Sequence, residues 1–362
     1  FDMKQFGGLR GRSTMHALVD ILHQWYAALD AGESVRVVFV DYAKAFDHVD
    51  HSTVLRKMTD MGVPAFIVQW MFSFLSGRKQ CVKIDKYFSG WLTLNGSMPQ
   101  GTWLGLYIFL ILINDLTATI QLDKFVDDVT LTERLIPDEP SNMQQELSRL
   151  QAWSNANLMN VNSKKTKEML LGPIIKSHPQ TLYLAGQQLE RVTSFKLLGV
   201  TIANTLKWDD YIAAICSKAA KRLHFLKLLK RSNISTDDLF YYYNAVILPV
   251  LEYGSVVWQA SITEEQIHQL DSIQRRAERI IQSSDPTSKL ESLQERRDML
   301  SKRFFASLLQ STNCLHNILP TPRDHLTIEK LRHANLYPIP FARTERYKRS
   351  FLVHALANYQ VA

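Results

Sequence analysis

The chain has 362 residues, of which 46% are hydrophobic and 21% charged, and its formal net charge is +7. This composition excludes an intrinsically disordered chain, and the length favours two or three domains over one. The positive charge favours an anionic partner such as nucleic acid. Three widely spaced cysteines, Cys81, Cys216 and Cys314, fit neither a disulfide framework nor a zinc knuckle and indicate a reducing compartment.

The first recognisable segment is a basic, glycine-rich loop. It runs from Gly7 to Ser13 and carries Arg10 and Arg12, which could contact phosphates. A solvated loop with two arginines is an equally good interpretation. The apolar spacing that follows predicts a helix from Met15 to Ala31, with Thr14 as its cap.

A short strand of β-branched residues, Val35 to Val40, is expected next, and it ends at Asp41. Burying an unpaired carboxylate is costly, so this position indicates a functional role for Asp41 rather than a stabilising one. Helices are predicted from Ser52 to Met61 and from Ala65 to Leu75. The core residues expected on the second of these helices are Phe66, Trp70, Met71 and Phe74.

Residues 80–84 and 91–94 are expected to form an antiparallel pair, which is followed by the segment Ser97 to Gly105. This segment brings Gln100 and exposed backbone to the start of an apolar helix, Trp103 to Ile113, a place suited to phosphate or sugar contacts. Without further context, an ordinary loop-to-helix entry is the simpler interpretation. The apolar run is much shorter than the ~18 residues of a bilayer span, so it predicts a buried core helix.

The stretch Phe125 to Leu131 places Asp127 and Asp128 between two apolar runs, which predicts a strand, a tight acidic turn and a second strand. Adjacent like charges repel, so a cation such as Mg²⁺ is the obvious partner, whereas a solvated turn is favoured if the pair is taken alone. Neighbouring central strands would bring Asp41 beside the pair. Three carboxylates are the minimum constellation for holding two metal ions about 4 Å apart for displacement at phosphorus.

Strands and helices alternate up to about residue 206, which predicts an α+β domain. Ser141 with Gln144 is expected to cap a helix that reaches Leu158, and a strand is expected from Glu168 to Leu171. From Asp209 onward the pattern is nearly all helical. We therefore expect one boundary near Leu206 and a weaker one at residues 285–288.

The helical part begins with a basic helix, expected from Tyr211 to Lys230, that carries Lys221 and Arg222. Its basic face could follow a nucleic-acid backbone, although a plain solvated face explains it at least as well. Ser235 with Asp238 is predicted to cap the next helix, which Pro249 would end, and a further helix is expected at 264–282.

Five motifs in this order resemble those of reverse transcriptases, above all those of non-LTR (LINE-type) retrotransposons. They are Val40-Asp41-Tyr42-Ala43-Lys44-Ala45-Phe46-Asp47, Met98 to Gly105, Phe125-Val126-Asp127-Asp128, Asn162-Ser163-Lys164-Lys165-Thr166 and Leu198-Gly199-Val200-Thr201. Individually most are weak, but five in this order and spacing are specific. The resemblance covers about Gln5 to Ile202, and residues 249–258 and 274–277 are similar to the region that follows in those elements.

The resemblance implies a right-hand polymerase fold. Residues 1–206 would form partial fingers and a palm with a ferredoxin-like sheet, 207–284 an α-helical thumb, and 285–362 a C-terminal helical region of unknown role. The chain starts at Phe1 in what reads as mid-domain sequence, so we expect a fragment that lacks upstream finger segments. Two further departures from the family pattern are Val126, where Ala or a similar residue is usual, and Leu106, where Pro is usual.

The resemblance also implies roles for single residues. Asp41, Asp127 and Asp128 would bind two Mg²⁺ ions, with Mn²⁺ as a substitute, and Lys165 would protonate the pyrophosphate leaving group. The residues implied for nucleotide binding are Tyr42, Lys44, Ala45, Phe46, Gln100 and Gly101, with Phe46 excluding a 2′-hydroxyl by its bulk. The residues expected to contact nucleic acid are Arg10, Arg12, Leu198 and Gly199 of the primer grip, Lys221 and Arg222.

The implied function is that of an RNA-directed DNA polymerase, with an RNA template, a DNA primer and deoxynucleoside triphosphates as partners and no membrane. The family alone suggests nuclear action; the sequence indicates only nucleus or cytoplasm. A catalytically inactive, nucleic-acid-binding remnant is the alternative: the missing fingers favour it and the three intact aspartates argue against it. An RNA-copying polymerase is disfavoured by Phe46.

Overall fold

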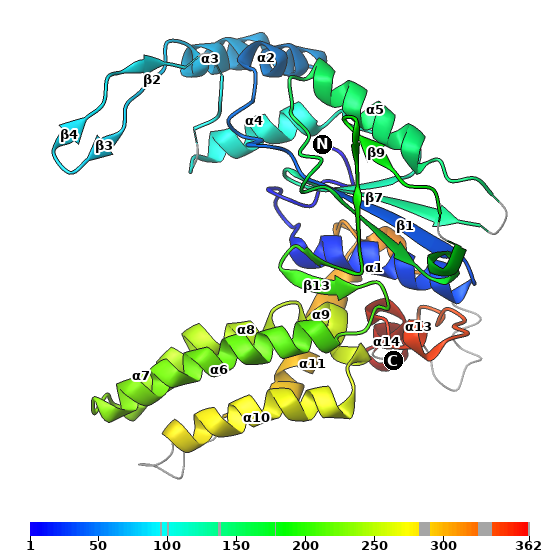
Figure 1. Cartoon of the computed structure of the whole chain (residues 1–362). Coiled ribbons are helices and arrows are strands. Elements are labelled where there is room, and N and C mark those ends of the chain that lie inside the picture. Colours follow the sequence, from blue (N-terminus) through cyan, green and yellow to red (C-terminus); the bar gives the residue numbers. More distant parts are fainter. Residues whose placement is uncertain are drawn as a thin grey trace. The chain divides into compact units, whose positions relative to one another are not determined.

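The computed structural model describes residues 1–94, 96–99, 101–136, 139–177, 179–281, 290–324 and 335–360 (Figure 1). The chain forms two compact units, one built from residues 1–17 and 34–192 and the other from 18–33 and 193–362. The boundary expected near Leu206 falls inside the second unit, and residues 285–288 lie outside the described residues. The division into palm, thumb and C-terminal region stays a prediction.

A five-stranded sheet organises the first unit, with the strand order β11-β8-β1-β7-β6. Its strands are β1 (Ser34–Val40), β6 (Gln121–Phe125), β7 (Asp128–Leu135), β8 (Lys167–Leu171) and β11 (Glu190–Val192). The pairs β8-β1, β1-β7 and β7-β6 are antiparallel, and β11 joins β8 in parallel. Helices connect β1 to β6 and β7 to β8, so the four antiparallel strands have the βαββαβ connectivity of a ferredoxin-like sheet. The expected α+β class and ferredoxin-like sheet are confirmed.

The helices of this unit are α2 (His51–Asp60), α3 (Ala65–Leu75), α4 (Trp103–Ile113) and α5 (Met143–Ala156). Asp50 caps α2 and Thr102 caps α4, each by accepting a hydrogen bond from a first-turn backbone amide. The predicted capping box of α5 is wrong, because the Gln144 side chain bonds the backbone of Tyr183 instead of reaching back to the start of the helix. Ser141 Oγ donates to Glu133 and accepts from the Met143 amide at 3.4 Å.

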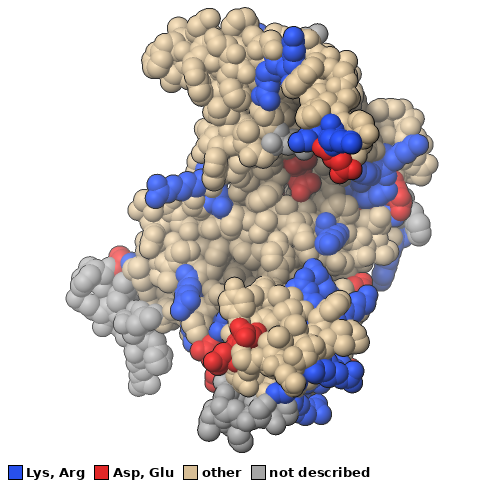
Figure 2. All heavy atoms as spheres, turned by 90° about the vertical axis from the view of Figure 1, so that its left-hand side faces the viewer, with Lys and Arg blue, Asp and Glu red and all other residues tan. Residues whose placement is uncertain are grey.

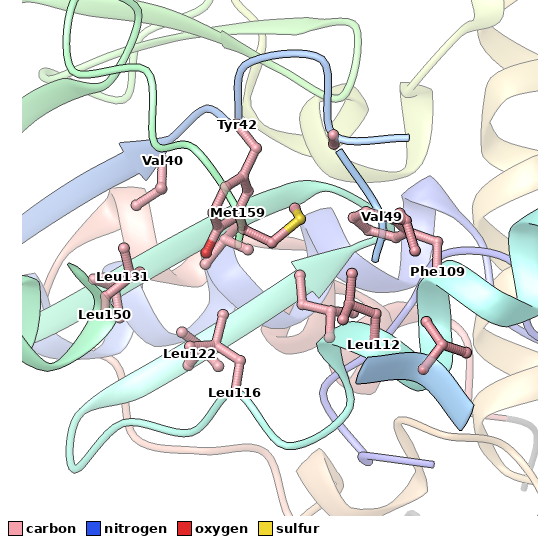
Figure 3. Packing of buried hydrophobic residues seen from close by; sticks show 14 of the residues in the cluster. Val40, Tyr42, Val49, Phe109, Leu112, Leu116, Leu122, Leu131, Leu150 and Met159 are labelled. Carbon is pink, nitrogen blue, oxygen red and sulfur yellow. The ribbon is translucent and has the colours of Figure 1, made fainter. Parts of the chain in front are cut away.

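Apolar side chains from the sheet and from α2, α4 and α5 form one core cluster (Figure 3). The labelled side chains of Leu122 and Leu131 on the sheet, Phe109 and Leu112 on α4, and Leu150 on α5 belong to it. Helix α3 contributes less than expected. Met71 is buried, but the side chains of Phe66 and Trp70 are 75% and 54% exposed, so their prediction as core residues is wrong. An almost wholly apolar helix leaves no polar face to tell which side is buried.

Short paired strands complete the first unit. β2 (Lys79–Gln80) pairs with β5 (Leu92–Thr93), and β3 (Lys83–Ile84) pairs with β4 (Tyr87–Phe88), so residues 79–93 form one long hairpin. Figure 1 shows this hairpin extending from the end of α3 away from the five-stranded sheet. A smaller hairpin joins β9 (Tyr183–Leu184) to β10 (Gln187–Gln188), and a 3-10 turn, η1, spans Pro173–Ser177.

The second unit is mainly helical, and it includes the part of α1 (Thr14–Asp30) that follows Ala17. A two-stranded hairpin, β12 (Ser194–Leu197) with β13 (Val200–Ala203), precedes its helices. They are α6 (Asp209–Arg231), α7 (Thr236–Tyr242), the π-helical turn η2 (Tyr243–Ile247), α8 (Leu248–Glu252), α9 (Ser255–Trp258), η3 (Gln259–Ser261), α10 (Glu264–Ile281), α11 (Leu293–Leu308), η5 (His316–Ile318), α13 (Glu345–Lys348) and α14 (Phe351–Asn358).

The predicted cap of α7 is confirmed, because Ser235 Oγ accepts from the Asp238 amide. Pro249, expected to end a helix, instead lies in the first turn of α8, where a missing amide hydrogen costs nothing. Within the described part of the chain, no helix combines the length and the apolar character that crossing a bilayer requires.

Candidate active site

The acidic motif forms the turn between β6 and β7 of the first unit. Phe125 pairs with Asp128 across the two strands, which leaves Val126 and Asp127 as the two residues of the turn. The predicted strand, turn and strand are confirmed. A two-residue turn holds its flanking residues in a fixed register, so the two carboxylates are set at one edge of the sheet.

Asp41 reaches the same edge from the neighbouring strand. Val40, the last residue of β1, pairs with Val129 of β7, so Asp41 follows directly beside Asp128. The loop that contains Asn162 and Lys165 is bonded to this point, because the Asn162 amide donates to the Asp41 carbonyl at 2.8 Å and the Asp41 amide donates to Thr166 Oγ1 at 3.2 Å. The sheet therefore brings together three of the five motifs.

The three carboxylates interact electrostatically. Burial and the charges of Asp127 and Asp41 raise the pKa of Asp128 to about 6. Burial, and then the Asp41 charge, raise the pKa of Asp127. Asp41 Oδ1 is buried without a hydrogen-bond partner. Repulsion and missing partners are costly for a folded chain, and an added cation would offset both.

A ready-made metal cage is absent from the described residues: no group of three or more His, Cys, Asp or Glu side chains has closed on a common point there. The aspartates are neighbours whose carboxylates have not converged. Their donor chemistry is nevertheless that of a site for a hard divalent cation, since carboxylate oxygens are the ligands such ions prefer.

The residues predicted to contact the nucleotide lie in two linked segments. Tyr42 and Ala45 are buried; the Tyr42 hydroxyl faces Ser154 Oγ at 3.3 Å, and burial raises the pKa of Tyr42 to about 12. Lys44 is exposed and has a positive φ of 48°. The ring of Phe46 stacks on Phe109, with centroids 4.7 Å apart. Their contacts with a nucleotide stay predictions.

The second segment begins at Met98, whose amide donates to the Phe46 carbonyl at 2.9 Å, so the two motifs are adjacent. Gly101 has a φ of 78° and open space around its Cα, which suits close approach of a ligand. Gln100 lies outside the described residues. Lys165 is exposed beside the Asn162 turn, and its proposed proton-donating role stays a prediction.

Arg10 and Arg12 differ in their surroundings. Arg10 is exposed, whereas the guanidinium of Arg12 donates to the backbone carbonyls of Asp2, Met3 and Gln5. Arg12 thus fixes the N-terminal segment. Its role in nucleic-acid binding stays a prediction.

The predicted nucleic-acid contacts of the second unit lie on its hairpin and on α6. Leu198 and Gly199 form the turn between β12 and β13, and the Tyr253 hydroxyl donates to the Leu198 carbonyl at 2.7 Å. Lys221 is exposed on α6. Arg222 donates to the Val246 carbonyl in the π-helical turn, so part of its guanidinium is engaged inside the unit. The nucleic-acid roles of all four residues stay predictions.

Sequence reasoning missed two features of the first unit. Gln5 is only 2% exposed, and its side chain bonds the backbone of the acidic turn. The hairpin of residues 79–93 exposes Tyr87 and Phe88 beside lysines, with Lys86 Nζ 5.6 Å from the Tyr87 ring centroid and Lys83 Nζ 5.3 Å from that of Phe88. The clustering of lysines and aromatic residues in 83–91 was a signal for the second feature, and nothing in the sequence pointed to the first.

A protein-family model described as "Reverse transcriptase (RNA-dependent DNA polymerase)" matches residues 1–202. Among curated proteins, the "Probable RNA-directed DNA polymerase from transposon X-element" of Drosophila melanogaster is 24% identical over 288 residues, which cover 76% of this chain and 31% of that protein. The "Putative 115 kDa protein in type-1 retrotransposable element R1DM" of the same organism is 28% identical over 275 residues, covering 73% and 26%. The chain thus spans about a third or less of the length of these relatives.

Among solved structures, apo telomerase from Candida tropicalis matches with a TM-score of 0.42 and 11% identity, over 84% of this chain and 51% of that one. Telomerase from Candida albicans, solved with a fragment of telomeric RNA, matches with a TM-score of 0.41 and 11% identity, over 96% and 54%.

Proposed function

The chain belongs to the reverse transcriptase family, and we propose that it is the polymerase part of a retrotransposon protein that copies RNA into DNA. In this reaction the primer 3′-hydroxyl attacks the α-phosphate of a deoxynucleoside triphosphate. A phosphodiester bond forms, the bond to the β-phosphate bridging oxygen breaks, and pyrophosphate leaves. The five-stranded sheet of the first unit is then the palm of a right-hand polymerase.

The observation that supports the proposal most is the placement of three aspartates side by side at one sheet edge. Asp41 directly follows β1, Asp128 begins the paired strand β7, and Asp127 occupies the turn between β6 and β7. Phosphoryl transfer depends mainly on positioning and on offsetting negative charge. A rigid strand edge is a suitable base for both.

Membership of the family implies dependence on a divalent metal ion, and the site fits one. The buried, unpartnered Oδ1 of Asp41 and the raised pKa values of Asp127 and Asp128 are the properties of carboxylates that lack a cation. We propose that Asp41, Asp127 and Asp128 hold two Mg²⁺ ions. Bound there, the ions would lower the pKa of the attacking hydroxyl and offset the charge of the leaving phosphate.

Other residues of the chain would position the substrates. The Phe46 ring, which stacks on Phe109, would lie against the sugar and reject a 2′-hydroxyl. The backbone at Gly101 would approach the nucleotide closely, because glycine has no side chain and the space where a Cβ would lie is open. Lys165, tethered beside Asp41 through the Asn162 turn, would donate a proton to the pyrophosphate.

Nucleic-acid binding is supported by charge and by exposed rings. The net charge is +7, and Figure 2 shows more Lys and Arg than Asp and Glu side chains on the face that it presents. In the hairpin of residues 79–93, exposed aromatic rings lie against lysine ammonium groups. Stacking on bases and pairing with phosphates are what such side chains supply to single-stranded nucleic acid.

The test is primer extension by the full chain on poly(rA) annealed to oligo(dT), with dTTP and Mg²⁺. The proposal expects elongation that stops when EDTA removes the metal. It also expects far slower extension when UTP replaces dTTP. Salt-dependent binding of the duplex without any extension would contradict the proposal and would favour the inactive nucleic-acid-binding remnant.

A further inference from the structure

The side chain of Gln5 bonds two backbone amides at once. Gln5 Oε1 accepts from the Gly7 amide at 2.9 Å and from the Val126 amide at 3.0 Å. Gln5 is only 2% exposed, so water competes little for these bonds. Val126 is the first residue of the acidic turn, and Asp127 and Asp128 follow it directly.

Gln5 is itself held in place along the edge of the sheet. The Lys124 amide donates to the Lys4 carbonyl at 2.9 Å, and the Phe6 amide donates to the Lys124 carbonyl at 2.8 Å. The segment thus runs beside β6 like a short additional strand, with Gln5 bridged to Lys124 in parallel. Arg12 adds hydrogen bonds to the carbonyls of Asp2, Met3 and Gln5. The Gln5 amide is therefore presented from a fixed backbone.

The turn that Gln5 bonds has an unfavourable conformation for its sequence. Val126 has a φ of 60°, and a β-branched residue rarely adopts this left-handed region. Gly7 packs directly against it, since a Cβ at position 7 would lie 2.6 Å from Val126 Cγ2 and 2.7 Å from its amide nitrogen. A conformation that the local sequence disfavours has to be held by contacts from elsewhere in the chain.

We propose that Gln5 is a positioning residue: its side-chain oxygen holds Val126 in the left-handed conformation and so sets Asp127 and Asp128 beside Asp41. The inference rests on the proposed function for its catalytic readout and on the structure alone for the coupling of Gln5 to Val126. Gln5 touches neither substrate nor metal in this account.

The experiment is a double-mutant cycle in the full chain with Gln5→Met and Val126→Gly. Methionine keeps the volume of glutamine but cannot accept these bonds, and glycine adopts a positive φ without steric cost. Two quantities are measured: Mn²⁺ affinity by the loss of its free electron paramagnetic resonance signal, and kcat for primer extension. Gln5→Met should lower the Mn²⁺ affinity and kcat about tenfold each, as expected for residues that orient metal ligands.

The decisive comparison is the effect of Gln5→Met in the Val126→Gly background. We expect the loss of Mn²⁺ affinity and of kcat to be only about twofold in that background, because glycine adopts the left-handed conformation without help from Gln5. An undiminished tenfold effect, or no effect of Gln5→Met in the natural background, would overturn the proposal. If the chain binds Mn²⁺ and shows this rescue but extends no primer, the proposed function fails and the inference stands.

Gln274→Ala is the matched control. Gln274 is also a buried glutamine whose Oε1 accepts from a backbone amide, that of Leu293 at 3.2 Å in the second unit. Any effect of Gln274→Ala on Mn²⁺ affinity or kcat should be the same with and without Val126→Gly. A smaller effect in the Val126→Gly background would overturn the proposal. Should Gln5→Met not fold, Gly7→Ala disturbs the same turn from its other side; an unchanged Mn²⁺ affinity in that variant would contradict the inference.

Discussion

Two groups of charged residues on the palm sheet differ in whether the folded chain supplies a partner of opposite charge. Arg36 on β1 and Glu168 on β8 form an ion pair at 2.7 Å with side chains only 2% and 1% exposed, and Arg191 donates to the same carboxylate at 2.9 Å. Asp41 follows the other end of β1 beside Asp128, and among the described residues these carboxylates have no cationic partner in an ion pair. The charges of the first group are neutralised within the folded chain, whereas those of the second group would be neutralised only by a bound cation.

The difference shows how to separate structural from functional charges. A buried charge that serves the fold brings its partner with it, because an unpaired one costs several kcal/mol. A charge that serves chemistry, such as those of the half-buried Asp41 and Asp127 and the exposed Asp128, leaves its partner to be supplied from solution. Variants at the two groups should therefore fail in different ways.

The largest effect is expected from Asp127→Asn combined with Asp128→Asn. Removing the carboxylates should cost about 4 kcal/mol of transition-state stabilisation, or roughly 10³-fold in the rate of primer extension. The fold should survive, since no structural ion pair is lost. Asp60→Asn is the control, because that carboxylate is 62% exposed and pairs only with Arg56 on the surface. Extension by the double variant within tenfold of the natural chain would refute this role.

Glu168→Gln should damage the fold instead. Breaking a buried ion pair leaves Arg36 unpaired and should lower the free energy of unfolding by about 3 kcal/mol, measured by urea denaturation. Glu190→Gln on the adjacent strand breaks a pair with Lys167 in which the glutamate is 67% exposed, and should cost at most about 1 kcal/mol. Equal losses of unfolding free energy in Glu168→Gln and Glu190→Gln would show that burial does not decide how much each ion pair contributes to stability.

Phe46→Val tests whether the Phe46 side chain contacts the sugar of the incoming nucleotide. A smaller side chain should admit the 2′-hydroxyl and raise ribonucleotide over deoxynucleotide use by about 10- to 100-fold, the discrimination expected of one apolar contact. The measurement is the ratio of kcat/KM for UTP and dTTP. Phe109→Leu removes the stacked ring behind Phe46 and should destabilise the chain while leaving that ratio within about threefold.

The smallest effect is expected on the stability of the metal-free chain when Asp128→Asn is introduced alone, and its size depends on pH. Because burial and the neighbouring carboxylates raise the pKa of Asp128 to about 6, the natural folded chain loses stability as pH rises through that value. Without metal, the variant should be more stable at pH 7.5 by at most about 1 kcal/mol, since this side chain is partly exposed. Thermal denaturation should show a smaller gain at pH 4.5 and almost none at pH 3, because the difference builds up between the ordinary pKa of 3.8 and the raised value of about 6. A gain of equal size at pH 3 and pH 7.5 would exclude charge repulsion as its cause.

The sequence predicted much of the palm. The helices Ala65–Leu75 and Trp103–Ile113 have the bounds that were expected, because Pro64 and Thr102 mark their starts. The proximity of Asp41 to Asp127 and Asp128 also followed from sequence, since carboxylates at the ends of adjacent strands have to share an edge. These are local signals or simple consequences of strand pairing.

Other features depend on contacts that no local pattern records. The bond from the Val126 amide to Gln5 joins residues 121 positions apart, and glutamine carries no sign of such a role. Ser141 and Gln144 were predicted to form a capping box, but the Gln144 side chain bonds the backbone of Tyr183, 39 residues away. Phe66 and Trp70 were predicted as core residues but are exposed. The helix α3 is apolar on almost every side, so its buried face cannot be read from periodicity.

The most direct test of the metal-binding edge is an Mn²⁺ titration followed by electron paramagnetic resonance, on the full chain with primer, RNA template and a non-hydrolysable deoxynucleotide analogue. The natural chain should bind two ions, and the Asp41→Asn, Asp127→Asn, Asp128→Asn variant should bind neither with comparable affinity. Equal binding by both chains would contradict the assignment of these three carboxylates as the metal ligands.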